Sequence, residues 1–270
     1  MSGMPSSATT PIVLVGDRFE SFIAAGLGTS AHGLAEAVGH GAWDGLAEPI
    51  QIHLGQGLDE AAVATVVEAV ERRGLGDRLL LDPRDLPAPV PPGAVHKRDA
   101  RNVLLADLVH DGADTFEASL RLHNDNELVL DHQSGPHLQG MILVEAARQL
   151  LLAVCELEYL RPWPDWTFSF LLTQLDTRFH RPVFPLPLRM QMTAHRADTA
   201  DVNRMRLGLE TRFVQGGREA ATSTVTASVH PSERFRPMER RAAEVAIAAL
   251  PQARPLAVPA NSGAESFPTS

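Results

Sequence analysis

The sequence predicts an α+β fold in which an antiparallel sheet wraps around one long helix, preceded by a small α/β unit. Three observations predict it: strand-like and helical segments alternate at the start, a proline-rich stretch follows, and a long apolar helix then stands among strand-like segments. The predicted organisation is a small α/β domain at 1–85, a linker at 86–93, the sheet-and-helix domain at 94–236, and a short helix with a disordered tail at 237–270.

Three short apolar runs in the first domain predict buried strands at 12–15, 50–54 and 78–81. Loosely helical residues follow the first run. After the second run, Asp59 is the predicted N-cap of a helix over 61–73, in which valines recur on one face. Alternation of strand and helix at this spacing indicates a small α/β unit.

Residues 86–93 hold four prolines in eight positions, a composition typical of an extended, semi-rigid linker.

The second domain follows this linker. Its apolar run 141–157 is long enough for a helix of about four turns. Gly216-Gly217 predicts a hairpin turn, and 237–250 a short helix before the tail. The predicted strands of this part are 103–109, 116–122, 168–179, 188–195, 204–214 and 219–230.

Composition excludes several classes of function. With 44% hydrophobic and 21% charged residues, the chain is expected to be globular. A net charge of -9 argues against nucleic-acid binding, and no apolar run approaches the roughly 18–20 residues of a membrane span. Cys155 is the only cysteine, so we expect no disulfide and no cysteine-based metal site. No spacing of His and Asp indicates another metal site, and no cofactor is expected. The N-terminus lacks the features of a signal peptide, and a cytoplasmic protein is expected.

The first domain carries a weak hint of a nucleotide loop in Gly26-Leu27-Gly28. These glycines do not directly follow the first predicted strand, and they do not complete a dinucleotide-binding motif. We therefore expect this domain to act as a docking module rather than a nucleotide-binding one.

The densest group of reactive residues lies in the loop 131–139 and the helix after it. His132 stands in a loop shaped by glycine and proline, and the helix beginning at Gly140 directs unpaired backbone N–H groups toward that loop. Such a helix end stabilises a carbonyl oxygen that gains negative charge. Glu145 follows in an otherwise apolar helix, where a carboxylate must be paired, protonated or used in chemistry. Gln149 is placed to hold Glu145 by a hydrogen bond.

This pattern resembles the active-site segment of hotdog-fold proteins, in particular the 3-hydroxyacyl-carrier-protein dehydratases. Segments 175–185 and 217–220 resemble a later strand and the closing hairpin of the same fold. The resemblance implies a hotdog fold for the second domain. The residues that carry it are His132, Gly135, Pro136, Gly140, Glu145, Ala146 and Gln149.

A closer resemblance is to the AfsA-type family, which is named for the biosynthesis of γ-butyrolactone signals. It is carried, over roughly 93–232, by Val95-His96-Lys97, the pair Asp131-His132 and the string from Gly140 to Gln149. The family typically has two hotdog repeats, whereas this chain has one. Hotdog proteins usually dimerise side by side, and the dehydratase His and Glu meet across the interface, so a homodimer is implied.

The resemblance also implies a role for each residue. His132 is the general base, Glu145 is a second acid–base group with a raised pKa, and the Gly140 N–H polarises the thioester carbonyl. Arg148 holds a phosphate or carboxylate, or instead pairs with an acid at the dimer seam. His137 competes as the base, because the spacing from His132 to Glu145 is one residue shorter than in the dehydratases.

Each of these roles has a plain structural alternative. His132 could cap the central helix, and Glu145 could be satisfied by neighbours in a non-catalytic dimer interface. His137 is expected to be structural rather than catalytic. His96 and Lys97 are expected simply to begin the domain.

The resemblance implies action on 3-oxoacyl or 3-hydroxyacyl thioesters of acyl carrier protein or coenzyme A. The leading expectation is AfsA-like acyl transfer to a small hydroxylated acceptor such as dihydroxyacetone phosphate. Dehydration of a 3-hydroxyacyl chain, hydrolysis of the thioester, and a non-catalytic binding module are the alternatives. The acyl length, the acceptor and the carrier are left open.

Overall fold

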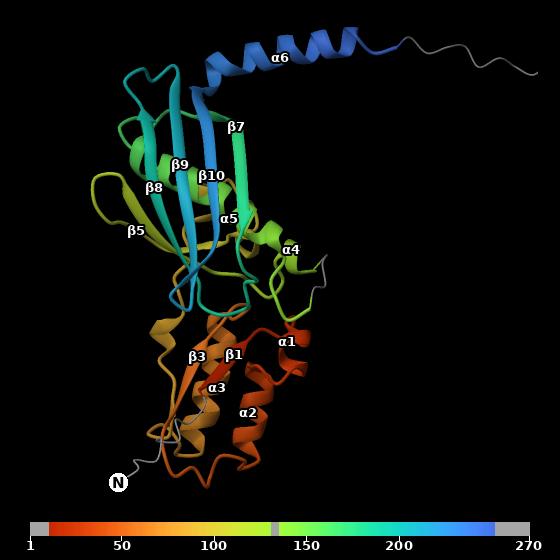
Figure 1. Cartoon of the computed structure of the whole chain (residues 1–270), viewed down its shortest axis with the longest axis vertical. Helices are drawn as coiled ribbons and strands as arrows, with labels where there is room; N and C mark the ends of the chain where they lie inside the picture. The colour runs from red at the N-terminus through yellow and green to blue at the C-terminus, as the bar shows by residue number, and fades with distance from the viewer. Residues whose placement is uncertain (1–10, 131–134, 252–270) are drawn as a thin grey trace, which may run out of the picture.

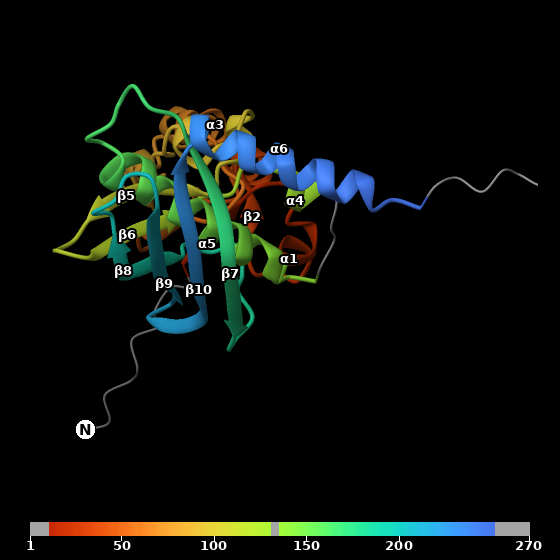
Figure 2. The ribbon, with the colours of Figure 1, turned by 90° about the horizontal axis from the view of Figure 1, so that it is seen from above.

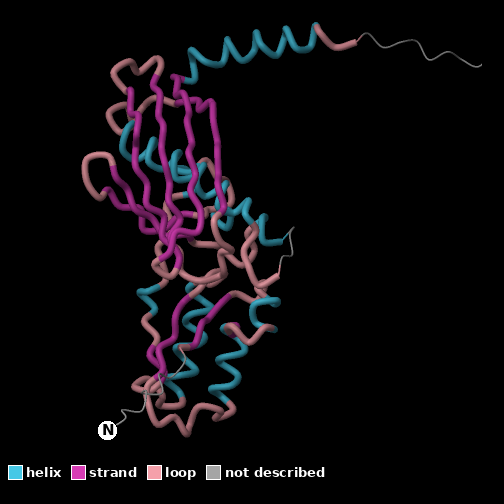
Figure 3. The backbone as a smooth tube through the Cα atoms, in the orientation of Figure 1, coloured by secondary structure: helices cyan, strands magenta, loops and turns pink. Residues whose placement is uncertain are grey.

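The computed structural model describes residues 11–130 and 135–251 and places two units end to end along the long axis of the molecule (Figure 1). Helices and short strands make up the N-terminal unit, whereas long strands dominate the larger unit (Figure 3). A last helix projects from the far end of the larger unit. The predicted disordered tail lies outside the described residues.

The N-terminal unit is a small parallel sheet flanked by helices. Its strand order is β2-β1-β3-β4, with β1 paired to both β2 and β3. The three strands predicted from apolar runs are confirmed, and β2 is an addition to them. The elements are β1 (Ile12–Val15), α1 (Glu20–Ala24), β2 (Thr29–Ser30), α2 (Ala31–Gly39), β3 (Ile50–Leu54), α3 (Glu60–Arg72) and β4 (Leu79–Leu80).

Helix α3 follows the sequence prediction closely. The Asp59 carboxylate accepts a hydrogen bond from the Ala62 backbone N–H at 2.7 Å, as an N-cap residue does. Val63, Val66 and Val70 are buried on one face of the helix. This apolar face packs into the core of the N-terminal unit.

The larger unit is an antiparallel sheet with the strand order β5-β6-β8-β9-β10-β7. The sheet curves around α5, which lies against its inner face (Figure 2). The antiparallel sheet around one long helix is thus confirmed. The elements are β5 (Leu105–His110), β6 (Thr115–Leu120), α4 (Glu127–Leu130), α5 (Gly140–Val154), the π-helical turn η4 (Cys155–Tyr159), β7 (Phe168–Phe179), β8 (Arg189–Asp198), β9 (Met205–Gln215) and β10 (Arg218–Pro231).

Helix α5 forms the centre of the larger core. Ten of its 15 residues are buried, because it is enclosed between the sheet and the segment that leads into β5. The predicted helix over 141–157 is nearly correct in extent. Its last turn, however, is wound as the π-helix η4 rather than as a continuation of the α-helix.

The proline-rich segment 86–93 lies along the edge of β5. The Val90 N–H donates to the Leu105 carbonyl, and the Asp107 N–H donates to the Ala88 carbonyl, both at 3.0 Å. Three 3-10 turns accompany this part of the chain: η1 (Pro83–Asp85), η2 (Pro92–Val95) and η3 (Ala100–Asn102).

A buried glutamine joins the two units. Gln56, only 4% exposed, follows β3 and lies between the end of β6 and the segment before β8. Its side-chain amide donates to the carbonyls of Leu120 and Leu186 at 3.1 and 3.2 Å. Its side-chain oxygen accepts from the Leu122 N–H at 2.7 Å, and its own N–H donates to the Pro185 carbonyl at 3.0 Å. All hydrogen-bond partners of this side chain therefore lie in the larger unit, although Gln56 itself belongs to the N-terminal unit.

Helix α6 (Ser232–Ala248) begins earlier than the predicted 237–250, with Pro237 inside it. The reason is anchoring of the first turn: the Ser232 N–H donates to the Thr167 carbonyl at 2.8 Å, and the Phe235 ring stacks on His230. Beyond this turn the helix extends outward past β7 (Figures 1 and 2). No helix in the described part of the chain is long and apolar enough to span a membrane.

Candidate functional site

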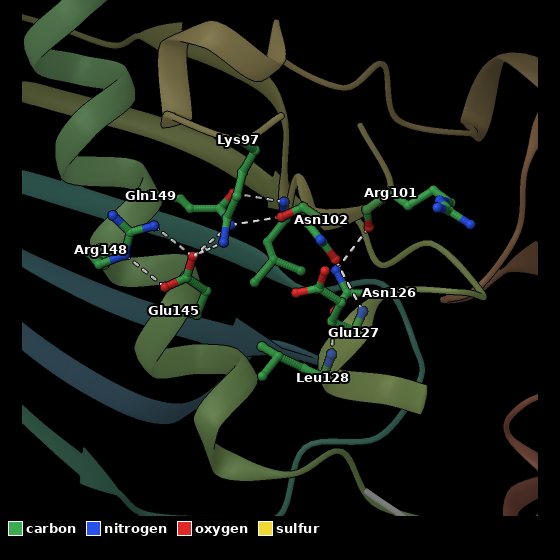
Figure 4. A network of polar contacts seen from close by, with 10 residues as sticks. Lys97, Arg101, Asn102, Asn126, Glu127, Leu128, Glu145, Arg148 and Gln149 are labelled. Atoms are coloured by element: carbon green, nitrogen blue, oxygen red, sulfur yellow. Dashed lines mark hydrogen bonds and ion pairs between the residues drawn. The ribbon is translucent and has the colours of Figure 1, made fainter. Parts of the chain in front are cut away.

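The candidate site lies where α5 meets the segment before β5. Three side chains converge on the carboxylate of Glu145 (Figure 4). Arg148 donates from Nε to Oε2 and from Nη2 to Oε1, both at 2.7 Å. Lys97 Nζ lies 2.9 Å from Oε1, and Gln149 Nε2 donates to the same oxygen at 3.0 Å. Both carboxylate oxygens are thus held by charge-assisted hydrogen bonds.

Gln149 ties this cluster to the rest of the fold. Its side chain is fully buried, and its amide nitrogen donates both to Glu145 and to the Asn102 carbonyl, the latter at 2.9 Å. Its oxygen accepts from the Leu104 N–H at 2.8 Å. The predicted hydrogen bond from Gln149 to Glu145 is confirmed, and it places the carboxylate in a fixed position against the β5 segment.

Glu145 is ionised at neutral pH. Burial alone raises the pKa of this carboxyl, but hydrogen bonds from Arg148, Lys97 and Gln149 outweigh burial and lower the pKa to about 2. The same contact raises the pKa of the Arg148 guanidinium. The prediction of a raised pKa for Glu145 is therefore wrong, because it left out the ion pair with Arg148 on the same helix and the contact with Lys97 from outside the helix.

This pKa shift predicts an acid-dependent contribution to stability. Relative to an ordinary glutamate pKa of 4.5, a folded pKa of about 2 corresponds to about 2–3 kcal/mol after allowance for partial exposure. Because the folded pKa is the lower one, this contribution is complete above about pH 5 and is lost as the pH falls toward 2. Urea unfolding of the wild type and Glu145→Gln measures it: the difference between them should shrink with acid. A difference that stays constant over this range would contradict the assignment.

Lys97 is a site residue that the sequence analysis missed. The turn η2 ends at His96, whose left-handed backbone (φ 55°) redirects the chain toward α5. Lys97 consequently reaches Glu145, while His96 Nε2 lies 2.8 Å from Oε1 of Glu156. The expectation that His96 and Lys97 simply begin the domain did not include these two contacts. The available signals were the Val95-His96-Lys97 resemblance and the fact that Lys97 is the only lysine.

The other predicted site residues lie around the N-terminus of α5. Gly140 is the first residue of the helix, and a Cβ there would come within 2.9 Å of the Phe179 ring. His137 is exposed and lines a cavity beside α1 and α4. His132 and its neighbour Asp131 lie outside the described residues, so their placement relative to Glu145 stays a prediction.

A second cavity opens beside Glu145. It has a volume of about 240 Å³ and is lined partly by charged and amide side chains and partly by apolar ones. Its polar residues are Lys97, Asn102, Asn126, Glu127 and Glu145. Within 11–130 and 135–251, no group of three or more His, Cys, Asp or Glu side chains is arranged to hold a metal ion.

Comparison with protein families gives one match that covers more than half of the chain. The model of the family described as "AfsA: A-factor biosynthesis hotdog domain" matches residues 81–231. The match includes α5 and every residue that contacts the Glu145 carboxylate, and it begins after the N-terminal sheet. No curated protein sequence matches the chain.

Several solved structures are similar to the larger unit. The dehydratase heterocomplex ApeI:P from Xenorhabdus doucetiae is 17% identical, with a TM-score of 0.38, covering 50% of this chain and 86% of that one. A putative thioesterase from Shewanella oneidensis is 11% identical, with a TM-score of 0.37, covering 47% and 84%. A thioesterase from Haemophilus influenzae is 18% identical, with a TM-score of 0.33, covering 46% and 78%.

Proposed function

Because the chain belongs to the AfsA family of A-factor biosynthesis hotdog domains, we propose that it transfers a 3-oxoacyl group from a thioester to a small hydroxylated acceptor. Membership confirms the hotdog fold predicted for the larger unit. The thioester carrier in this proposal is acyl carrier protein or coenzyme A. The acceptor is a small polyol or hydroxyketone, with dihydroxyacetone phosphate as the first compound to test.

The observation that carries the proposal is the ionised state of Glu145. In a dehydration, this residue would have to be protonated to help the substrate hydroxyl leave as water. With its pKa lowered to about 2 it holds no proton at neutral pH. Acyl transfer needs no proton from Glu145, so the ionised carboxylate favours transfer over dehydration.

The cavity beside Glu145 suits a small polar acceptor. Lys97 and Arg148 bring two positive charges to the Glu145 carboxylate, and Glu127 brings a second carboxylate to the cavity lining. The amide groups of Asn102 and Asn126 lie on the same polar side. A small hydroxylated acceptor matches this lining in size, and Lys97 is the lining cation that an anionic group of the acceptor would contact.

The proposed reaction assigns three steps. His132 removes the proton from the acceptor hydroxyl, and the resulting oxygen attacks the thioester carbonyl carbon. The tetrahedral oxyanion is stabilised by the Gly140 N–H at the N-terminus of α5. The C–S bond then breaks, and the sulfur leaves as a free thiol after taking the proton from His132. In this scheme Glu145 positions Lys97 and Arg148 against the acceptor.

Mass spectrometry of the products tests the proposal. Purified protein is incubated with a 3-oxoacyl thioester, with and without dihydroxyacetone phosphate. We expect an acyl ester only when the acceptor is present. Release of free acid in both samples would replace transfer by hydrolysis, and an untouched thioester would favour dehydration of 3-hydroxyacyl chains or a binding module.

Lys97→Met should weaken binding of an anionic acceptor. Removing one charge-assisted contact is expected to raise KM for dihydroxyacetone phosphate about tenfold or more. KM for uncharged dihydroxyacetone should change much less. Arg161→Met, at an exposed position outside this cavity, is the control and should leave both values unchanged. Equal effects of Lys97→Met on the two acceptors would contradict the assignment of Lys97 to the anionic group.

The edge strand β7 supports a homodimer. In the described sheet this strand pairs with β10 on one side only, and Leu171, Leu172 and Phe179 are exposed along it. A long edge strand with exposed apolar residues invites pairing with another chain. In the proposed dimer, two β7 strands lie side by side.

Leu172→Arg should therefore convert the protein to a monomer in sedimentation velocity at micromolar concentration. The control is Val109→Arg, which adds the same charge at an exposed position on β5, the opposite edge strand of the sheet. That variant should keep the wild-type mass. A monomeric wild type, or a Leu172→Arg variant that stays dimeric, would rule out pairing through β7.

A further inference from the structure

Beyond its first turn, helix α6 buries none of its residues against the described part of the chain. Ser232 and Phe235 are its buried residues, whereas every residue from Arg236 to Leu250 is exposed. Most helices in proteins owe their stability to the packing of an apolar face. The helix also lies outside residues 81–231, which match the AfsA family. A partner that covers its apolar face would therefore stabilise it.

The apolar residues of α6 form a stripe that continues its anchored face. At intervals of three or four residues, apolar side chains share one side of the helix: Phe235, Met238, Ala242 and Val245. The ring of the first of them stacks on His230 of β10. The opposite side of the helix carries the exposed ion pair between Arg240 and Glu244. The stripe is thus an exposed extension of a surface that already packs on the sheet.

The direction of α6 carries this stripe beyond the edge strand β7. Two perpendicular views show the helix passing β7 and extending away from the sheet (Figures 1 and 2). Its start is fixed beside the first residues of β7, because the hydroxyls of Ser232 and Ser169 lie 3.0 Å apart in a hydrogen bond. Its 17 residues span about 25 Å, whereas neighbouring strands of a sheet lie about 4.8 Å apart. A strand added to β7 would therefore lie within reach of α6.

A second copy of this chain is the partner that the β7 edge accommodates in the proposed dimer. In a two-fold dimer with a continuous sheet, the two β7 strands run antiparallel, so the end of one strand lies beside the start of the other. The first turns of α6 then face the partner's Phe179, at the end of the partner's β7. In each protomer the Phe179 ring lies beside Gly140, the first residue of α5. The α6 helix of one subunit therefore approaches the start of α5 in the other.

Exposed apolar residues gather where this contact would form. Leu130 ends α4, Met141 is the second residue of α5, and Phe179 ends β7. Their exposed fractions are 49%, 57% and 53%. The Gln139 side chain donates to the Leu128 carbonyl and so joins α4 to the start of α5. These three apolar side chains therefore belong to one end of the larger unit, and they offer an apolar surface to the stripe of α6.

We infer that α6 is an arm that packs on a second copy of this chain, with its apolar stripe against the partner's Leu130, Met141 and Phe179. The inference rests on the proposed β7 dimer, and it does not depend on the reaction. Because Met141 also lines the cavity beside Glu145, the arm of each subunit borders the candidate site of the other.

Sedimentation velocity of the full-length protein over a dilution series tests the stripe. Val245→Arg should raise the dissociation constant of the dimer about tenfold or more, because it places a charge in an apolar contact. Ile247→Arg is the matched control. Both side chains are 65% exposed, and two positions along an α-helix turn a residue by about 200°, to the opposite side. Ile247→Arg should keep the wild-type value, and equal effects of the two variants would overturn the inference.

Cross-linking between two single-substitution chains tests the position of the arm. Chains with Met238→Cys are mixed with chains with Leu130→Cys, left to exchange subunits and treated with a flexible bismaleimide. The native Cys155 is fully buried and stays unreacted. We expect a product of twice the chain mass in this mixture. Val109→Cys, on the opposite edge strand β5, replaces Leu130→Cys in the control and should give none. Equal yields in the two mixtures would contradict the assigned contact.

The outcomes separate this inference from the proposals beside it. A dimer that is lost in Leu172→Arg but unaffected by Val245→Arg would overturn the inference and keep the β7 pairing, and a monomeric wild type would overturn both. A dimer that depends on Val245 in a protein that forms no acyl ester would overturn the acyl-transfer function and keep the inference. If Val245→Arg left the dimer unchanged but abolished binding to phosphatidylglycerol vesicles, the stripe would belong to a membrane surface instead.

Discussion

Replacing Glu145 with glutamine should lower the rate of acyl transfer by at least about 100-fold, a loss typical of removing a positioned charged group from an active site. The glutamine can still accept hydrogen bonds, but it no longer balances the charges of Lys97 and Arg148, which both lie within 3 Å of the carboxylate. Those two cations would then reorient toward solvent. Single-turnover measurement of ester formation, with circular dichroism to confirm folding, gives the value.

The matched control is Glu156→Gln. Glu156 is also partly buried, also lies in the helical segment of α5 and η4, and also contacts a basic side chain, His96, at 2.8 Å. It lines neither the cavity beside Glu145 nor the cavity beside α1. Activity close to wild type is expected for this control. Equal activity of Glu145→Gln and Glu156→Gln would remove Glu145 from the functional site.

Gln56→Leu should lower the free energy of unfolding by about 3 kcal/mol, because three buried backbone groups lose their partners. The carbonyls of Leu120 and Leu186 and the N–H of Leu122 all bond to the Gln56 side chain. Leucine has a similar volume, so cavity formation contributes little. Urea unfolding monitored by tryptophan fluorescence measures the change.

Gln51→Leu serves as the control for this substitution. Gln51 belongs to the same strand β3, but it is exposed and its amide donates to the carbonyl of Leu80 within the N-terminal unit. A change below about 0.5 kcal/mol is expected there. Similar losses for the two variants would show that the joint between the units does not depend on Gln56.

Features that depend on neighbouring residues in the sequence were predictable. The Asp59 cap, the strands other than β2 and the hydrogen bond from Gln149 to Glu145 all follow from spacing within one element. Even so, local patterns missed the start of α6 at Ser232. That start depends on contacts with Thr167 and His230, which pack against the first turn and outweigh the presence of a proline.

Features that depend on distant residues were not predictable from one sequence. Lys97 stands 48 positions before Glu145, and nothing in the helix sequence indicates that this lysine reaches the carboxylate. The sign of the Glu145 pKa shift follows from that contact and from Arg148, since burial alone would raise it. The role of His132 as the general base of this site stays a prediction.

The Gln56 joint also constrains the order in which the chain can fold during synthesis. The N-terminal unit leaves the ribosome first, yet the partners of Gln56 lie 64 and 130 residues later in the chain. At about 5–20 residues per second, the second partner follows Gln56 by roughly 6–26 s. Throughout that interval the carboxyl edge of the small sheet is uncovered, so this surface would be open to chaperones or to misassociation until the segment before β8 arrives.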